Sequence, residues 1–87
     1  MKYYNMLFQA VKKQVDAFDA YGLLKGGAPN DEFDGETNLI ATRIKKGMSA
    51  ENIAEIMAQV MNTQFEHIFK TKELLPFAKE IEKFLND

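Results

Sequence analysis

Apolar side chains recur at helical spacing along residues 2–20. One stripe consists of residues three or four positions apart, Tyr4, Leu7, Phe8, Val11, Val15 and Phe18. Polar residues fall on the opposite side, as in an amphipathic helix. A second, weaker apolar line lies beside this stripe, at Tyr3, Met6, Ala10 and Ala17. We expect the second line to be partly buried within the monomer. Alternatively, the loop that follows or another subunit covers it.

Residues 21–30, YGLLKGGAPN, interrupt the helical pattern. Their three glycines lower helix stability, and Pro29 disfavours a helix at the residue before it. Burial is favoured for the apolar side chains near the start of the segment, Tyr21, Leu23 and Leu24. The segment is therefore predicted to be a loop folded against the helices, with Gly26 and Gly27 at its turn.

A second and a third helix are predicted over residues 31–46 and 50–70. The second begins with acidic residues and ends with the basic residues Arg43, Lys45 and Lys46. This order matches the helix dipole at both ends. Gly47 is placed to end the helix in the left-handed conformation, and Ser49 is typical of the N-cap of the next helix. So short a connection predicts neighbouring, roughly antiparallel helices.

The third predicted helix is apolar over more than half of its circumference, which indicates a central position. His67, the only histidine, is expected on this helix at the rim of its apolar face. The last apolar stripe predicts a fourth helix over residues 74–86, with Pro76 in its first turn, where a missing amide has little effect. These elements predict an all-α, compact four-helix bundle-like domain over residues 1–87, with a Gly/Pro-rich loop between its first two helices.

Composition limits the partners and cofactors that we expect. The chain has 87 residues, enough for one small core, and its 46% hydrophobic and 28% charged residues are typical of a soluble globular protein. It lacks cysteine, which excludes disulfides and thiolate metal sites. Its net charge of −2 gives no long-range attraction to nucleic acid or to an anionic membrane. We expect a cytoplasmic protein, a monomer or weak homodimer, without a cofactor or a metal.

An acidic cluster follows the glycine-rich loop, at Asp31, Glu32, Asp34 and Glu36. With Asn30 as the first position, the alternating oxygen-bearing side chains and Gly35 resemble the opening of a calcium-binding loop. The comparison fails at the twelfth position, Ala41, where a bidentate glutamate is required. The dipole of a helix stabilises carboxylates at its N-terminus, and this accounts for the cluster without a cation.

Glu36 is the acidic residue that we expect to face the core, because it falls between Phe33 and Ile40 on a helical wheel. A carboxylate in that position must be paired or partly hydrated. Arg43, two turns further on, is the candidate partner within the chain, and a basic or amide group of another protein is the alternative. The lone His67 has no recognisable nucleophile or second metal ligand beside it, so no catalytic residue is predicted.

Two stretches carry a family resemblance, residues 18–23, FDAYGL, and residues 27–34, GAPNDEFD, supported by Glu36, Ile40 and Ile44. They resemble the YugE-like family of small bacterial proteins, a domain of unknown function with a tryptophan-aspartate-proline turn before glycine-leucine and a GAP-x-DE-aromatic-D-x-E stretch. Here Phe18 replaces the tryptophan and Ala20 the proline, so we expect a looser turn. The resemblance implies a compact all-helical fold and fixed places for four acids, Asp19, Asp31, Asp34 and Glu36.

Three functions remain open for such a domain. The first is a non-enzymatic protein–protein interaction or regulatory module that contacts its partner through Asp19, Asp31, Asp34 and Glu36. The second is a toxin-immunity or inhibitor protein, whose acidic patch occupies a basic active site. The third is a metal-dependent or carboxylate hydrolase that uses Asp31, Asp34, Glu36 and His67. We expect the first, because the sequence pairs no groups into a catalytic arrangement.

Overall fold

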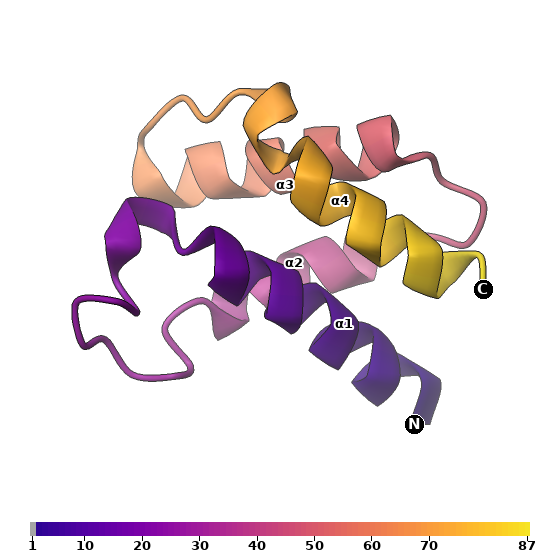
Figure 1. Cartoon of the computed structure of the whole chain (residues 1–87), viewed down its shortest axis with the longest axis horizontal. Helices are drawn as coiled ribbons and strands as arrows, with labels where there is room; N and C mark the ends of the chain where they lie inside the picture. The colour runs from indigo at the N-terminus through magenta and orange to yellow at the C-terminus, as the bar shows by residue number, and fades with distance from the viewer. Residues whose placement is uncertain (1) are drawn as a thin grey trace.

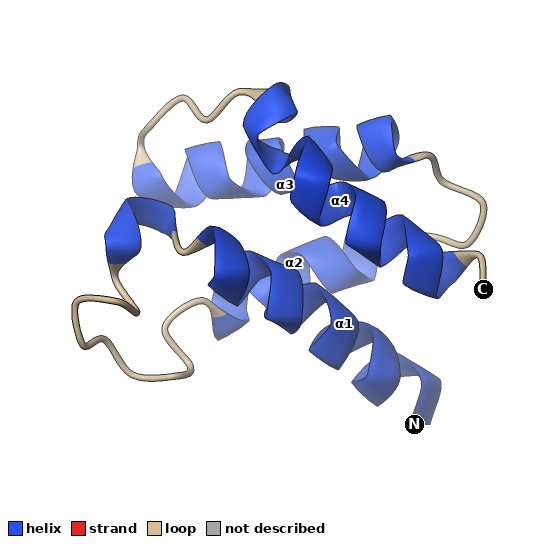
Figure 2. Ribbon diagram, in the orientation of Figure 1, coloured by secondary structure: helices blue, strands red, loops and turns tan. Residues whose placement is uncertain are grey.

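The apolar stripes fold into four α-helices within residues 2–87, the part of the chain that the computed structural model describes (Figure 1). The helices are α1 (Lys2–Phe18), α2 (Asp34–Arg43), α3 (Ala50–Phe65) and α4 (Thr71–Leu85). One turn of 3-10 helix, η1 (Ala20–Gly22), follows α1. No strand occurs between residues 2 and 87, and loops join the helices, with η1 as a helical turn in the first connection (Figure 2). The predicted all-α fold class is confirmed.

The four helices close a ring around the core. Helix α3 packs against α2 and α4, and α1 packs against the same two helices from the other side. The centre of the ring holds fully buried side chains from all four helices, among them Val11, Ile40, Ile53, Met57 and Ile81. Each such side chain contributes about 1.5 to 3 kcal/mol through burial. Helix α3 therefore does not stand at the centre as predicted, although it supplies more buried residues than any other helix.

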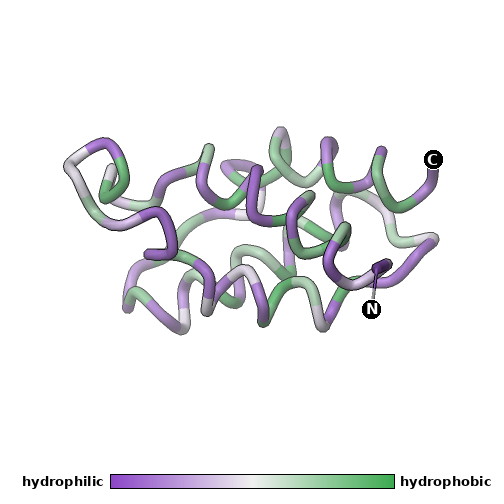
Figure 3. Tube along the Cα trace, turned by 90° about the horizontal axis from the view of Figure 1, so that it is seen from below, coloured by the Kyte–Doolittle hydropathy of each residue, from purple (hydrophilic) through white to green (hydrophobic). Residues whose placement is uncertain are grey.

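Hydrophobic and hydrophilic residues alternate along the coiled trace of the chain (Figure 3). Of the second apolar line on α1, Ala10 is half-buried, whereas Ala17 is exposed and Tyr3 and Met6 are 59% and 58% exposed. Tyr3 stacks on Phe84 of α4, with ring centroids 6.4 Å apart. The expected partial burial thus applies to Ala10 alone. Within residues 2–87, no helix is long and apolar enough to cross a membrane.

Helix α3 ends five residues before its predicted end. Glu66 adopts the left-handed conformation (φ 50°, ψ 38°) and stops the helix after Phe65. The side chain of Asn62 then binds the backbone of Phe69 twice: its Oδ1 accepts from the N–H at 2.6 Å, and its Nδ2 donates to the carbonyl oxygen at 3.2 Å. These bonds turn the chain back and bury Phe69. His67 therefore lies in the loop between α3 and α4, not on the helix as predicted.

Helix α4 begins three residues before its predicted start. The N–H of Lys70 donates to Oε2 of Glu73 at 2.8 Å, and the N–H of Glu73 donates to the carbonyl oxygen of Lys70 at 2.9 Å. This reciprocal pair caps the helix N-terminus. Pro76 consequently lies inside the helix rather than in its first turn. Its missing amide leaves the Lys72 carbonyl without a helical partner, and both residues are exposed, so water can hydrate that carbonyl.

Helix α2 is shorter than predicted at both ends. It begins at Asp34, after a turn in which the Glu32 N–H donates to the Pro29 carbonyl oxygen at 3.0 Å. It ends at Arg43, because the next residue is extended (ψ 150°). Gly47 has the predicted positive φ of 94°, but it lies in the turn before α3 and does not cap α2. The predicted cap of α3 is confirmed, since Oγ of Ser49 accepts from the Asn52 N–H at 3.1 Å.

Candidate functional site

Asp19 organises the start of the segment that joins α1 to α2. Its backbone is left-handed (φ 49°), a conformation that aspartate tolerates better than most residues. Its carboxylate oxygens accept hydrogen bonds from two backbone amides, Leu24 N–H at 2.8 Å and Lys25 N–H at 3.1 Å. Its carbonyl oxygen accepts from Gly22 N–H at 2.7 Å. The half-buried Asp19 carboxylate is therefore engaged within the chain, and it fixes the loop.

The glycine-rich part of this segment forms a compact turn. The Gly26 N–H donates to the Gly22 carbonyl oxygen and the Ala28 N–H to the Leu23 carbonyl oxygen, both at 2.9 Å. Gly27 has a φ of 104°, which glycine adopts without strain. The side chains of Leu23 and Leu24 pack against the core. The predicted packing of the loop against the helices is thus confirmed for Leu23 and Leu24, whereas Tyr21 is 57% exposed and not buried as predicted.

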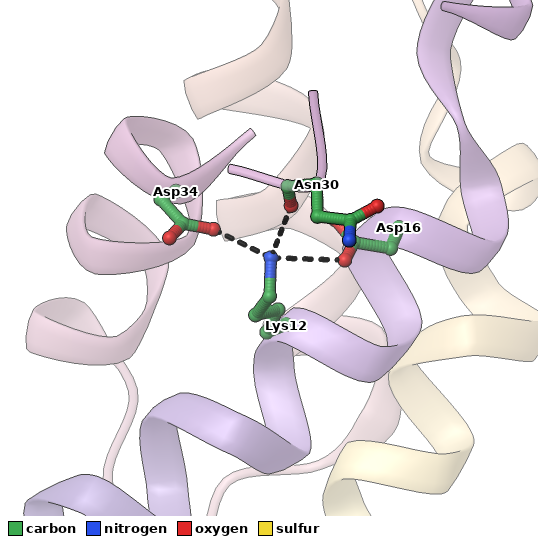
Figure 4. A network of polar contacts seen from close by, with 4 residues as sticks. All are labelled: Lys12, Asp16, Asn30 and Asp34. Carbon is green, nitrogen blue, oxygen red and sulfur yellow. Dashed lines mark hydrogen bonds and ion pairs between the residues drawn. The ribbon is translucent and has the colours of Figure 1, made fainter. Parts of the chain in front are cut away.

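Lys12 ties the other end of the segment to α1 (Figure 4). Its Nζ donates to Oδ1 of Asp34 at 2.7 Å and to the carbonyl oxygen of Asn30 at 2.6 Å, and it lies 3.1 Å from Oδ2 of Asp16. The hydrogen bond to Asp34 is the largest cause that raises the pKa of Lys12 above its ordinary value of 10.5; Asp16 adds to the effect and burial opposes it. The sequence placed Lys12 on the polar side of its helix and gave no sign of this contact.

Three other carboxylates of the segment are not engaged in this way. Asp31 and Glu32 are exposed and Glu36 is half-buried. Among residues 2–87, no hydrogen bond or ion pair involves the side chain of any of the three. We call Asp31, Glu32 and Glu36 the acidic surface. The four predicted site residues therefore divide, with Asp19 and Asp34 serving the loop and Asp31 and Glu36 available to a partner.

Thr37, and not Glu36 as predicted, occupies the core-facing position on α2. Thr37 is fully buried, in line with Phe33 and Ile40, and Glu36 lies at the edge of this stripe. The predicted ion pair with Arg43 does not form, since Arg43 is exposed and neither residue belongs to an ion pair within residues 2–87. Glu36 is thus partly hydrated, which was one of the two ways in which a carboxylate can be tolerated there.

Aromatic side chains gather where η1 meets the end of α3. The Tyr21 hydroxyl donates to the carbonyl oxygen of Phe65 at 3.2 Å, and the ring centroids of these residues are 5.7 Å apart. The His67 ring lies 4.4 Å from the Phe69 ring and 5.6 Å from the Tyr21 ring. We call Tyr21, Phe65, His67, Ile68 and Phe69 the aromatic corner. Sequence periodicity missed it, because it assigned residues 66–70 to a helix.

No candidate metal site is found in the described part of the chain. Residues 2–87 contain no group of three or more histidine, aspartate or glutamate side chains that could hold a metal ion, and no pocket. His67 packs against aromatic rings and joins no such group with Asp31, Asp34 or Glu36.

The chain was also compared with known proteins. No protein-family model matches it, and neither a curated protein nor a solved structure is similar to it. The resemblance to the YugE-like family therefore stays a prediction from the residues that carry it.

Proposed function

We propose that the protein is a non-enzymatic interaction module, and that the acidic surface contacts a basic region of a protein partner. The observation that carries the proposal is that some carboxylates bind groups within the chain and others do not. Asp19 and Asp34 fix the segment between α1 and α2, and the acidic surface stands on this fixed segment without an internal partner. A surface held in one conformation loses less entropy on binding than a mobile one. Electrostatic complementarity then selects a basic partner.

The same proposal includes a cytoplasmic location and the relationship to the YugE-like family. A housekeeping module and an immunity protein would both use an acidic surface of this kind, and the two differ in the partner that they bind. Growth rescue from a toxin encoded beside the protein distinguishes them.

The test is affinity capture from native cells with a variant in which Asp31, Glu32 and Glu36 are all replaced by alanine. We expect this variant to lose the partners that the wild-type protein captures, as measured by quantitative mass spectrometry. The matched control replaces Glu51, Glu55 and Asp87 by alanine, which removes the same charge from exposed positions elsewhere. An unchanged set of partners in the first variant would falsify the proposal.

A further inference from the structure

The aromatic corner contains two large hydrophobic residues that are exposed to water. Ile68 is 79% exposed and Tyr21 57% exposed, and they are two of the four large hydrophobic residues that remain in water within residues 2–87. Both belong to loops at one end of the molecule, η1 after α1 and the α3–α4 connection, which Figure 1 shows on the same side. Clustered exposed apolar residues mark contact surfaces more often than scattered ones do.

Tyr21 is held in place although its ring is exposed. Its hydroxyl bonds to the Phe65 carbonyl oxygen, and its ring lies 5.7 Å from the Phe65 ring and 5.8 Å from the Phe69 ring. The backbone is unusual at this corner as well: Asp19, Tyr21 and Glu66 are the non-glycine residues with positive φ within residues 2–87. Such conformations are strained, and they persist where the surrounding structure fixes them. A fixed aromatic side chain loses little entropy when a partner packs on it.

Phe33 links the segment that carries the acidic surface to the aromatic corner. Phe33 follows Asp31 and Glu32 directly, and its ring lies 5.9 Å from the Phe65 ring of the corner. Glu66 follows Phe65 and is exposed. In the loops before α2 and after α3, the exposed acids Asp31, Glu32 and Glu66 outnumber the exposed lysines Lys25 and Lys70. Glu36, in the first turn of α2, adds a further negative charge.

We propose that the aromatic corner and the acidic surface form one docking surface for a short segment of a protein partner. That segment carries a large aliphatic or aromatic side chain flanked by lysine or arginine. The apolar side chain packs on Tyr21 and Ile68, and the cations face Glu32 and Glu66. This inference rests on the proposed function and adds the chemistry of the partner to it.

A second copy of the chain fits this surface less well. A symmetric contact between two copies places the same patch on both sides, so two surfaces that each carry more acids than lysines would face each other. Juxtaposed like charges oppose association. The negative balance therefore favours a basic partner over self-association.

The probe for the test is a library of short random peptides, selected for binding to the full chain. We expect the selected peptides to share a large apolar residue with lysine or arginine beside it. The Ile68→Ser variant, which alters an exposed side chain and leaves the core intact, should bind them about tenfold more weakly. The Tyr21→Phe variant keeps the ring but loses the hydroxyl bond to the Phe65 carbonyl oxygen, so it should bind them less tightly than the wild type and more tightly than Ile68→Ser. The matched control Met6→Ser changes an exposed apolar residue on α1 and should have no effect.

Four results would overturn the inference. Selected peptides without shared basic residues would show that the partner chemistry is wrong. Equal binding by the wild type and the Ile68→Ser variant places the contact elsewhere. Self-association of the wild type that disappears in the Ile68→Ser variant, measured by sedimentation equilibrium, assigns the corner to a second copy. If the triple alanine variant of the acidic surface loses its cellular partners and Ile68→Ser keeps them, the proposed function stands and this inference fails.

Discussion

Lys12 and Asp34 join the middle of α1 to the first residue of α2 through an ion pair of 2.7 Å between Nζ and Oδ1. The same Nζ holds the carbonyl oxygen of Asn30, four residues before Asp34. One lysine thus fixes both the end of the loop and the start of the helix. The acidic surface lies between and just after these two anchors, so its geometry depends on a residue that does not belong to it.

We expect Lys12→Met to lower the free energy of unfolding by about 1 to 2 kcal/mol, because it removes hydrogen bonds to a charged group while it keeps most of the apolar stem. Solvent limits the loss, since the side chain of Asp34 is 38% exposed. Urea denaturation measures the change. The control is Lys13→Met, the same substitution at the exposed neighbour, which should change stability by less than about 0.5 kcal/mol. Equal stability of the two variants would show that the ion pair does not support the fold.

The contribution of Lys12 should depend on pH in the alkaline range. Its pKa in the folded protein is raised above 10.5, mainly by Asp34. A group with a raised pKa stabilises the fold fully below its unfolded pKa, and the stabilisation is lost as pH rises through the folded pKa. The stability difference between wild type and Lys12→Met should therefore be constant near pH 8 and smaller near about pH 11. Urea denaturation of both proteins at both pH values tests this, because the titration of other residues cancels in the difference. A difference that grows with pH would contradict it.

The Asp19 carboxylate should matter for stability rather than for partner binding. Asp19→Ala removes the acceptor of two backbone amides, and we expect it to lower the free energy of unfolding by about 2 kcal/mol. Asp19→Asn keeps one acceptor oxygen and the tolerance of positive φ, so it should lose less. Hydrogen exchange provides the local readout, since the amides of Leu24 and Lys25 should lose protection in Asp19→Ala. The control Asp31→Ala should leave both amides protected, and loss of protection there as well would refute the assignment.

The helices could be predicted from the sequence, because apolar spacing is a local property. The stripes of Val11 and Val15 and of Ile53 and Met57 predicted the sides of α1 and α3 that face the core, and the core contains them. The ends of α3 and α4 could not be predicted in the same way. Glu66 stops α3 without the glycine that usually marks a left-handed cap, and the Asn62 side chain reaches seven residues ahead to Phe69.

The candidate site was predictable in composition and not in detail. Four acids near a glycine-rich loop are visible in the sequence. Which of them bind groups within the chain depends on contacts between distant residues. Lys12 lies on the polar side of α1 and meets Asp34 only because the loop folds back over 22 positions. The aromatic corner brings Tyr21 to Phe65, 44 positions further on, and no local pattern predicts such a contact.

Substitution of Thr37 tests the packing of α2 against the core. It is fully buried on α2, and its Oγ1 has no hydrogen-bond partner. A buried hydroxyl without a partner is unfavourable, and valine has the same shape without the polar atom. We expect Thr37→Val to raise the free energy of unfolding by about 1 kcal/mol, which corresponds to a Tm increase of about 4 to 8 °C for a domain of this size. Calorimetry measures the shift.

The control Thr42→Val changes an exposed threonine on the same helix and should move Tm little. A lower Tm for Thr37→Val would mean that the hydroxyl is satisfied in solution, and that the start of α2 relaxes to accept its hydrogen bond.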